Sequence, residues 1–489
     1  MALVISMASC NIIINPDNTD EGSDTDVTYP HSDMELADLN AVIATSANQS
    51  FPVSTFRYFF MDSYSAFINN YYYYLSYYGL DVNVPLHDQI NSTTNESWYK
   101  YFLDSGKSAF EQYAKFAEKA IEEGMSLSEA DLAEIDAYLD GIQKTAEEYD
   151  MTFEEYMADY MGDGMTREMI REAVKISQLG YNYYEKIYYA PEYTDDEIEA
   201  EYIKNIKNYA LIDFCTVSIE ALYDETDDED AKSAAIADAK KKGDDIAALI
   251  EGGKSFAEAV VEICPELAEK KSASTSTGDE ETTEYKTDAD YLVEGAYYAE
   301  GASYAFLFDE GTEVGDVKVD VSEAGDVTLV QAVKLPYKDA SRTVNVRHIL
   351  LDASKYDTQE EAAAAAEALL KQINESNDPK ATFISLVADN SADGGSVTNG
   401  GLYEGVFPGD MIDEFDAWCF DESRKIGDTG VVFTDYGYHV MYMEGFGDEL
   451  WYSYVDGALR DAEFEALSEA IYEEVKIEYN EELLDKIAR

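Results

Sequence analysis

The chain has few of the residues that build metal or redox sites, and few basic residues. Its 489 residues include four histidines and four cysteines, and the cysteines form no Cys-x-x-Cys pair or Cys/His cluster. We therefore expect no disulfide framework, no metal site and no cofactor. Lys and Arg number 34 against 102 Asp and Glu, a net charge of -68. Phosphate backbones need clustered basic residues, so this charge excludes nucleic acid as a partner.

The sequence also lacks any run of 18 or more apolar residues, so we expect no membrane-spanning helix. The first ten residues are typical of the end of a secretory signal, an apolar run followed by small residues. Residues 7–10, Met-Ala-Ser-Cys, resemble a bacterial lipobox, in which the cysteine carries the lipid of the mature protein. This resemblance implies lipidation of Cys10; the alternative is a buried or incidental cysteine.

Acidic residues and tyrosine are abundant, with 40 tyrosines. An acidic surface either keeps a chain soluble by self-repulsion or selects basic clients. Residues 11–40 are polar and acidic and predict a tether that cannot fold alone. Residues 41–208 predict a strand followed by a helical domain. Hydroxyl and glutamate pairs that can cap helices occur in residues 126–129, 152–155 and 194–197.

Residues 67–78 are aromatic on every side of a predicted helix, so one buried stripe cannot hold all the rings. We expect some of these tyrosines to face solvent, where they could hold unfolded segments. The alternative is that they pack between helices.

Alignment of the chain with itself reveals two related segments, residues 209–336 and 342–447. Their closing halves match without gaps, which places Val327 opposite His439. Upstream, Asp213 falls opposite His348. We therefore expect the first copy to keep the fold and to lack the site.

Within the first copy, residues 271–290 are rich in Ser, Thr, Glu and Asp and predict a disordered insertion in place of a glycine loop. In the second copy, residues 358–361 predict the capped start of an alanine-rich helix. His348 and His439 lie in strand-like segments, and the glycine-rich loop between them begins at Asp393.

Residues 342–447 resemble a parvulin-type peptidyl-prolyl isomerase, and the whole chain resembles the PrsA-like extracytoplasmic foldase lipoproteins, with their SurA-like chaperone architecture. The resemblance implies a multidomain α+β fold, with a mostly helical chaperone domain and two parvulin-like domains, each a small antiparallel sheet with packed helices. The implied parts are a signal and lipobox remnant at residues 1–10, a tether at 11–40, a helical chaperone domain at 41–208, a degenerate parvulin-like domain at 209–336, an active parvulin domain at 342–447, and a C-terminal helix at 448–489 that packs on the N-terminal domain.

The resemblance also implies roles for single residues. His348 and His439 match the paired histidines of the parvulin site, and Thr434 matches the hydroxyl that bonds to that pair. Asp393 falls where parvulins carry Cys or Asp beside the target carbonyl. The residues that match the apolar socket for proline are Leu402, Met411 and Phe415. Taken singly, each histidine could be a core residue, and Asp393 could merely cap a turn.

The implied function is that of a peptidyl-prolyl cis-trans isomerase and chaperone. It would act on unfolded secreted polypeptides that contain Xaa-Pro bonds, at the outer face of a bacterial cell membrane. This chemistry needs neither a metal nor a nucleophile. An alternative is a non-catalytic holdase in which the parvulin units are a scaffold and the tyrosine-rich helices bind clients. A third is a surface lipoprotein for an unrelated ligand.

Overall fold

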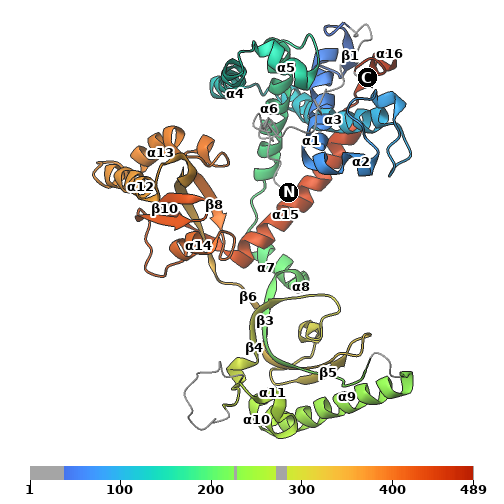
Figure 1. The fold of residues 1–489 in the computed structure, drawn as a ribbon, viewed down its shortest axis with the longest axis vertical. Coiled ribbons are helices and arrows are strands. Elements are labelled where there is room, and N and C mark those ends of the chain that lie inside the picture. Colours follow the sequence, from blue (N-terminus) through green and yellow to red (C-terminus); the bar gives the residue numbers. More distant parts are fainter. Residues whose placement is uncertain (1–37, 225–227, 271–283, 488–489) are drawn as a thin grey trace. The chain divides into compact units, whose positions relative to one another are not determined.

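The computed structural model describes residues 38–224, 228–270 and 284–487 (Figure 1). Cys10, the lipobox-like residues 7–10 and nearly all of the expected tether lie outside the described residues. The chain divides into two compact units, Met1–Glu192 with Arg460–Arg489 and Tyr193–Leu459. Among the described helices, none combines the length and apolarity needed to cross a bilayer.

The first unit is helical around an aromatic core, with one small sheet of strand order β11-β1-β2. Phe56 and Phe59 of the first helix contact Phe110 edge-on, and Trp98 stacks on Phe102. Its elements are β1 (Val42–Thr45), β2 (Ser50–Pro52), α1 (Val53–Tyr71), η2 (Tyr72–Tyr74), α2 (Leu75–Tyr78), η3 (Leu86–Asp88), α3 (Trp98–Glu122), α4 (Glu129–Glu148), α5 (Phe153–Met161), α6 (Arg167–Tyr189), β11 (Glu478–Tyr479) and α16 (Glu481–Leu484).

Several helices begin at a residue whose side-chain hydroxyl caps the first turn. Thr152 and Glu155 cap α5 reciprocally, which confirms the prediction at residues 152–155. At α4 the predicted position was wrong by two residues, because Ser128 and Asp131 form the capping box. Ser126 and Ser128 each precede an acidic residue by three positions, so the local pattern does not distinguish them.

The tyrosine-rich run is not one continuous helix. α1 ends at Tyr71, and the chain passes through the 3₁₀ turn η2 into α2. Tyr73 is 90% exposed and Tyr77 is 79% exposed, whereas Phe67 packs edge-on against Trp98. The prediction that some of these rings face solvent is therefore confirmed.

The second unit contains two four-stranded antiparallel sheets with matching strand orders, β4-β3-β6-β5 and β8-β7-β10-β9. The elements before and within the first sheet are α7 (Asp195–Lys204), α8 (Ile206–Tyr209), β3 (Ala210–Ile219), α9 (Glu229–Glu251), α10 (Phe256–Ile263), α11 (Pro265–Ala268), η4 (Asp288–Asp290), β4 (Leu292–Tyr297), η5 (Ala305–Phe308), β5 (Val317–Val321) and β6 (Val327–Lys338). Those of the second are β7 (Arg342–Asp352), η6 (Ala353–Lys355), α12 (Gln359–Asn374), α13 (Pro379–Asn390), η7 (Val397–Asn399), β8 (Leu402–Val406), α14 (Asp413–Cys419), β9 (Thr429–Thr434) and β10 (Gly437–Glu449).

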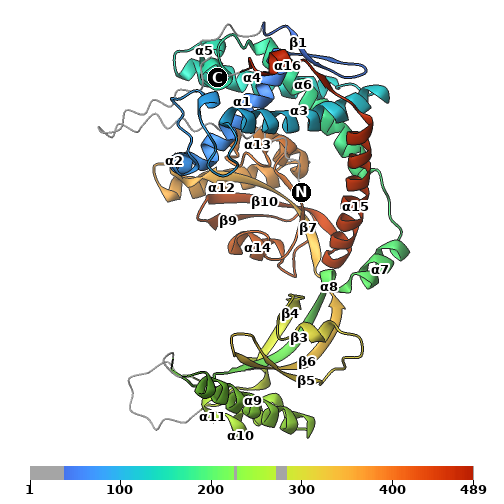
Figure 2. The same cartoon turned by 90° about the vertical axis from the view of Figure 1, so that its right-hand side faces the viewer.

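Helices cover both faces of the second sheet. α12 and α13 lie on one face, and α14 lies on the other (Figure 2). Ile349 and Val440 point toward α12 and α13, whereas Val346 and Met441 point toward α14. Side chains alternate along a strand, so His348 and His439 share the α14 face. The α+β expectation is confirmed for this unit.

The pairing of strands shows which residues of the first sheet correspond to the two histidines. His348 pairs with Met441, which lies two positions after His439. In the first sheet, Thr216 pairs with Val330, which lies two positions after Thr328. The amides of Gly315 and Gly427 donate to the carbonyls of Ala332 and Met443, so Thr328, four residues before Ala332, takes the place of His439. The pairing then gives Thr216 the place of His348.

The predicted counterparts, Asp213 and Val327, were therefore wrong. The amides of Gly315 and Gly427 donate to equivalent carbonyls of β6 and β10, and the stretch that follows Gly315 is one residue longer. Asp213 lies where the pairing of β3 with β6 shifts register. An ungapped alignment cannot detect either irregularity.

The part of the predicted insertion that the structure describes is ordered. Tyr285 forms a β-bridge with Glu269, and residues 288–290 form η4, so the prediction of disorder was wrong for this part. Residues 271–283 lie outside the described residues.

The C-terminal segment begins with the long helix α15 (Leu450–Glu474). Leu450 is buried, but Tyr454 and Leu467 are exposed. Farther on, β11 pairs with β1, and Leu484 and Ile487 are buried in the core of the first unit.

Candidate functional site

The central feature of the site is a pair of stacked imidazoles. His348 on β7 and His439 on β10 are brought together by the pairing of these central strands. Their Nδ1 atoms lie 3.0 Å apart, and their rings are nearly parallel, with an interplanar angle of 13°. His348 is 4% exposed and His439 is 5% exposed. Two buried ring nitrogens at this distance share one proton in a hydrogen bond.

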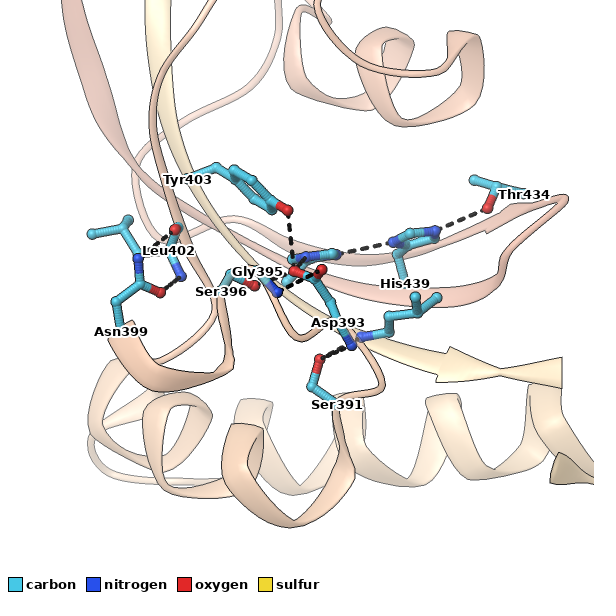
Figure 3. A network of polar contacts seen from close by, with 11 residues as sticks. Ser391, Asp393, Gly395, Ser396, Asn399, Leu402, Tyr403, Thr434 and His439 are labelled. Carbon is cyan, nitrogen blue, oxygen red and sulfur yellow. Dashed lines mark hydrogen bonds and ion pairs between the residues drawn. The ribbon is translucent and has the colours of Figure 1, made fainter. Parts of the chain in front are cut away.

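The loop after α13 adds a carboxylate to this pair (Figure 3). His348 Nε2 lies 2.8 Å from Asp393 Oδ2, and the Ser396 hydroxyl also donates to that oxygen. The amide of Gly395 donates to Oδ1 at 3.3 Å. Ser391 Oγ accepts from the amides of Asp393 and of Leu350 on β7, which ties the loop to the strand.

A hydroxyl closes the other end of the network. Thr434 Oγ1 lies 2.9 Å from His439 Nε2 and accepts a hydrogen bond from the amide of Tyr436. The side chain of Tyr436 itself is exposed. Four side chains, from Thr434 through the two histidines to Asp393, thus form one continuous chain of hydrogen bonds (Figure 3).

The hydrogen-bonding partners fix the direction of this chain when both histidines are neutral. An ionised Asp393 only accepts, so His348 carries its proton on Nε2 and its Nδ1 is an acceptor. His439 must then donate from Nδ1, and its Nε2 accepts from the hydroxyl of Thr434. Each imidazole thus has a single defined tautomer.

The charge states support this assignment. The hydrogen bond from His348, with further bonds from Ser396 and Gly395, outweighs burial and holds the pKa of Asp393 well below its ordinary value. Burial lowers the pKa of His439 to about 4. At neutral pH the site therefore contains an ionised Asp393 and a neutral His439.

The glycines of the loop allow it to approach β7. Gly400 and Gly401 have φ of 71° and 76°, a region that favours glycine. A Cβ on Gly401 would lie 2.4 Å from the carbonyl oxygen of His348. Arg347 anchors the loop through bonds of 2.9 and 2.8 Å from Nη1 to the carbonyls of Asn399 and Gly400.

Apolar side chains lie beside the imidazoles on the α14 face. The ring of Phe415 meets both histidine rings edge-on, with centroids 5.5 Å from each. Met411 precedes α14 and packs on the same cluster. Together they form an apolar wall next to the polar network.

Leu402 does not belong to this wall, and its assignment to the proline socket was wrong. It pairs with Arg347, which points to the opposite face of the sheet, while its neighbour Tyr403 pairs with Val346 on the α14 face. A shift of one residue along a strand reverses the face of every side chain. Tyr403 therefore occupies the position assigned to Leu402.

Sequence reasoning missed three residues that bond to this network, namely Ser391, Ser396 and Tyr403. A hydroxyl three residues after Asp393 was a usable signal, because Asp and Ser side chains commonly bond across a tight turn. The role of Tyr403 depends on strand pairing, which the local sequence does not reveal. Over the described ranges, no three His, Cys, Asp or Glu side chains cluster so as to hold a metal ion.

Comparisons with known proteins find relatives of this part of the chain. The profile of the PPIC-type PPIASE domain family matches residues 329–445. The chain is 29% identical over 140 residues to foldase protein PrsA 1 of Listeria monocytogenes serovar 1/2a, covering 29% of this chain and 40% of the relative. It is 28% identical over 136 residues to foldase protein PrsA 1 of Listeria innocua serovar 6a, covering 28% and 42%. The chain thus spans less than half the length of these relatives.

Among solved structures, PrsA from Bacillus anthracis is similar at 24% identity, with a TM-score of 0.19, over 27% of this chain and 54% of that chain. PrsA from Bacillus subtilis is similar at 21% identity, with a TM-score of 0.20, over 29% of this chain and 54% of that chain. The similarity is therefore confined to part of each molecule.

The low pKa of His439 predicts that acid destabilises this sheet. Between pH 6.5 and 4 the unfolded chain binds a proton that folded His439 does not, so stability falls as the pH falls. The shift from 6.5 to about 4 corresponds to a loss of about 3 kcal/mol. The free energy of opening of β10, measured by hydrogen exchange of the intact chain across this range, should show this loss.

The matched variants are His439→Gln, which removes the titrating group, and His87→Gln, which removes an imidazole stacked on Tyr99 in the other unit. The first should flatten the pH dependence of β10, and the second should leave it unchanged. If the hydrogen-exchange protection of β10 falls equally with pH in the wild type and in His439→Gln, His439 is not the cause of the acid destabilisation.

Proposed function

We propose that this chain, whose residues 329–445 belong to the PPIC-type peptidyl-prolyl isomerase family, is an extracytoplasmic foldase that combines isomerase and chaperone activities. Its substrates are unfolded polypeptides that contain Xaa-Pro bonds. The observation that carries the proposal is the buried, directed chain of hydrogen bonds from Thr434 to Asp393, next to the apolar wall of Met411 and Phe415.

The reaction makes and breaks no covalent bond. Rotation about the peptide C–N bond has a barrier of about 18–20 kcal/mol, because the planar amide is stabilised by resonance. An enzyme lowers this barrier by binding the twisted amide more tightly than the planar one. Such a site needs an apolar surface for the proline ring and polar groups fixed for the twisted carbonyl.

The residues present meet these needs. Phe415 and Met411 offer the apolar surface, beside two imidazoles that Thr434 and Asp393 hold in fixed tautomers. Fixed dipoles need no reorganisation as the amide rotates, which is the advantage of a preorganised site. We assign His348, Asp393, Thr434 and His439 to catalysis, and Met411 and Phe415 to binding of proline.

The first parvulin-like copy has a different role in this proposal. Thr216 and Thr328 stand where the second copy has its imidazoles, and Thr216 donates to the carbonyl of Leu329 within its own sheet. We infer that residues 209–336 form a degenerate domain that serves as a scaffold, and that residues 342–447 form the active one.

The isomerase proposal predicts that the intact chain accelerates cis-trans exchange of short Xaa-Pro peptides. An Asp393→Ala, His439→Ala double variant should lose about tenfold or more in kcat/KM, because it removes both polar anchors of the network. Exchange rates measured by NMR with catalytic amounts of protein give the result directly.

A Thr216→Val, Thr328→Val double variant is the matched control, since it alters the equivalent positions of the other sheet. It should retain wild-type rates. Wild-type rates no higher than those of the Asp393→Ala, His439→Ala variant would refute the isomerase assignment.

The exposed tyrosines support a chaperone role for the first unit. Tyr71 to Tyr74 and Tyr77 all expose their rings, which present apolar area together with a hydroxyl. We propose that they hold unfolded clients. Replacing Tyr73 and Tyr77 by Ser should weaken suppression of aggregation of an unfolded client by the intact chain, while peptide isomerisation stays at the wild-type rate. Unchanged suppression would place client binding elsewhere.

The lipobox-like residues 7–10 motivate the proposed location. We infer that Cys10 carries a lipid that holds the protein at the outer face of a bacterial cell membrane. Expression of the gene in its host should give a protein with the added mass of the lipid that partitions into detergent. A Cys10→Ser variant should lose both properties, and identical mass and partitioning in the two proteins would exclude the anchor.

A further inference from the structure

Tyr403 contacts the network from the edge of the sheet (Figure 3). Its hydroxyl lies 3.1 Å from Asp393 Oδ2, and its ring centroid lies 5.2 Å from that of His348. The ring also packs on the apolar cluster that contains Phe415 and Val346. One side chain thus joins the carboxylate, an imidazole and the apolar wall.

The hydrogen bond from Tyr403 completes a crowded set of donors on one oxygen. Asp393 Oδ2 receives bonds from His348 Nε2, the Ser396 hydroxyl and the Tyr403 hydroxyl, while Oδ1 receives the amide of Gly395. Each carboxylate oxygen has about two lone-pair sites, so three donors saturate Oδ2, and Oδ1 keeps room for one more. Asp393 is therefore held in one orientation, with its charge spread over several bonds.

Tyr403 remains a donor throughout the physiological range. Burial, together with the charge of Asp393, raises the pKa of Tyr403 to about 12. Its single hydrogen points to Asp393, and its oxygen keeps lone pairs that can accept from a donor of the substrate.

We propose that Tyr403 is a positioning residue of this site. Its hydroxyl positions Asp393, and through Asp393 it fixes the orientation of His348. This proposal rests on the proposed isomerase function and deepens it, because it assigns the orientation of two catalytic side chains to a hydroxyl on β8.

Two substitutions test this role in the intact chain. Tyr403→Phe keeps the ring and removes the hydroxyl, so it should lower kcat about threefold to tenfold with KM within about twofold of the wild type. Tyr403→Leu also lacks the hydroxyl, so it should lower kcat at least as much as Tyr403→Phe. Tyr438→Phe, which removes a hydroxyl from the opposite face of the same sheet, is the control with wild-type kinetics.

A second measurement does not depend on turnover. In Tyr403→Phe the carboxylate of Asp393 loses one donor and becomes a stronger acceptor for His348. The NMR signal of the Nε2 proton of His348 should therefore move downfield, while Tyr438→Phe leaves it in place. A role in packing alone would leave this signal unchanged in Tyr403→Phe.

The outcomes are distinct. A wild-type chain without isomerase activity, in which the proton signal still moves in Tyr403→Phe, refutes the proposed function and retains the positioning role. Wild-type kcat and an unmoved signal in Tyr403→Phe overturn the positioning role.

Discussion

The hydrogen bond between the Nδ1 atoms of His348 and His439 is the interaction on which the site depends. Two imidazoles buried side by side are favourable only when each ring nitrogen has a partner, because an unpaired polar atom in the interior costs free energy. Thr434 and Asp393 supply the two outer partners. Removal of either one leaves a ring nitrogen buried without a partner, and its imidazole then has no defined tautomer.

The surrounding fold can be understood as support for this pair. The register of β7 against β10 sets the distance between the rings, and α14 places Phe415 edge-on against both. On the opposite face, Arg347 bonds to Glu444 and to the loop carbonyls, which holds Asp393 near the strand. The sheet of the first copy lacks the imidazoles and has the equivalent strand order.

Much of this arrangement could be predicted from the sequence, because it depends on local patterns. The alternating segments placed both histidines in strands, and the Asp-Gly-Gly loop marked Asp393. The errors arose where pairing between strands decides the outcome. Leu402 and Tyr403 are adjacent, and only the register against β7 shows which one faces the site. The counterparts of the histidines in the first copy were missed for the same reason, since bulges and turn lengths do not appear in an ungapped alignment.

The most direct test of this account is nitrogen-15 NMR of the histidine side chains in the intact chain at neutral pH. When both rings are neutral, a directed network predicts that His348 carries its proton on Nε2 and His439 carries its proton on Nδ1, each as a single tautomer. A spectrum in which His439 is protonated on Nε2, or in which either ring exchanges between tautomers, would contradict the proposed direction of the hydrogen bonds.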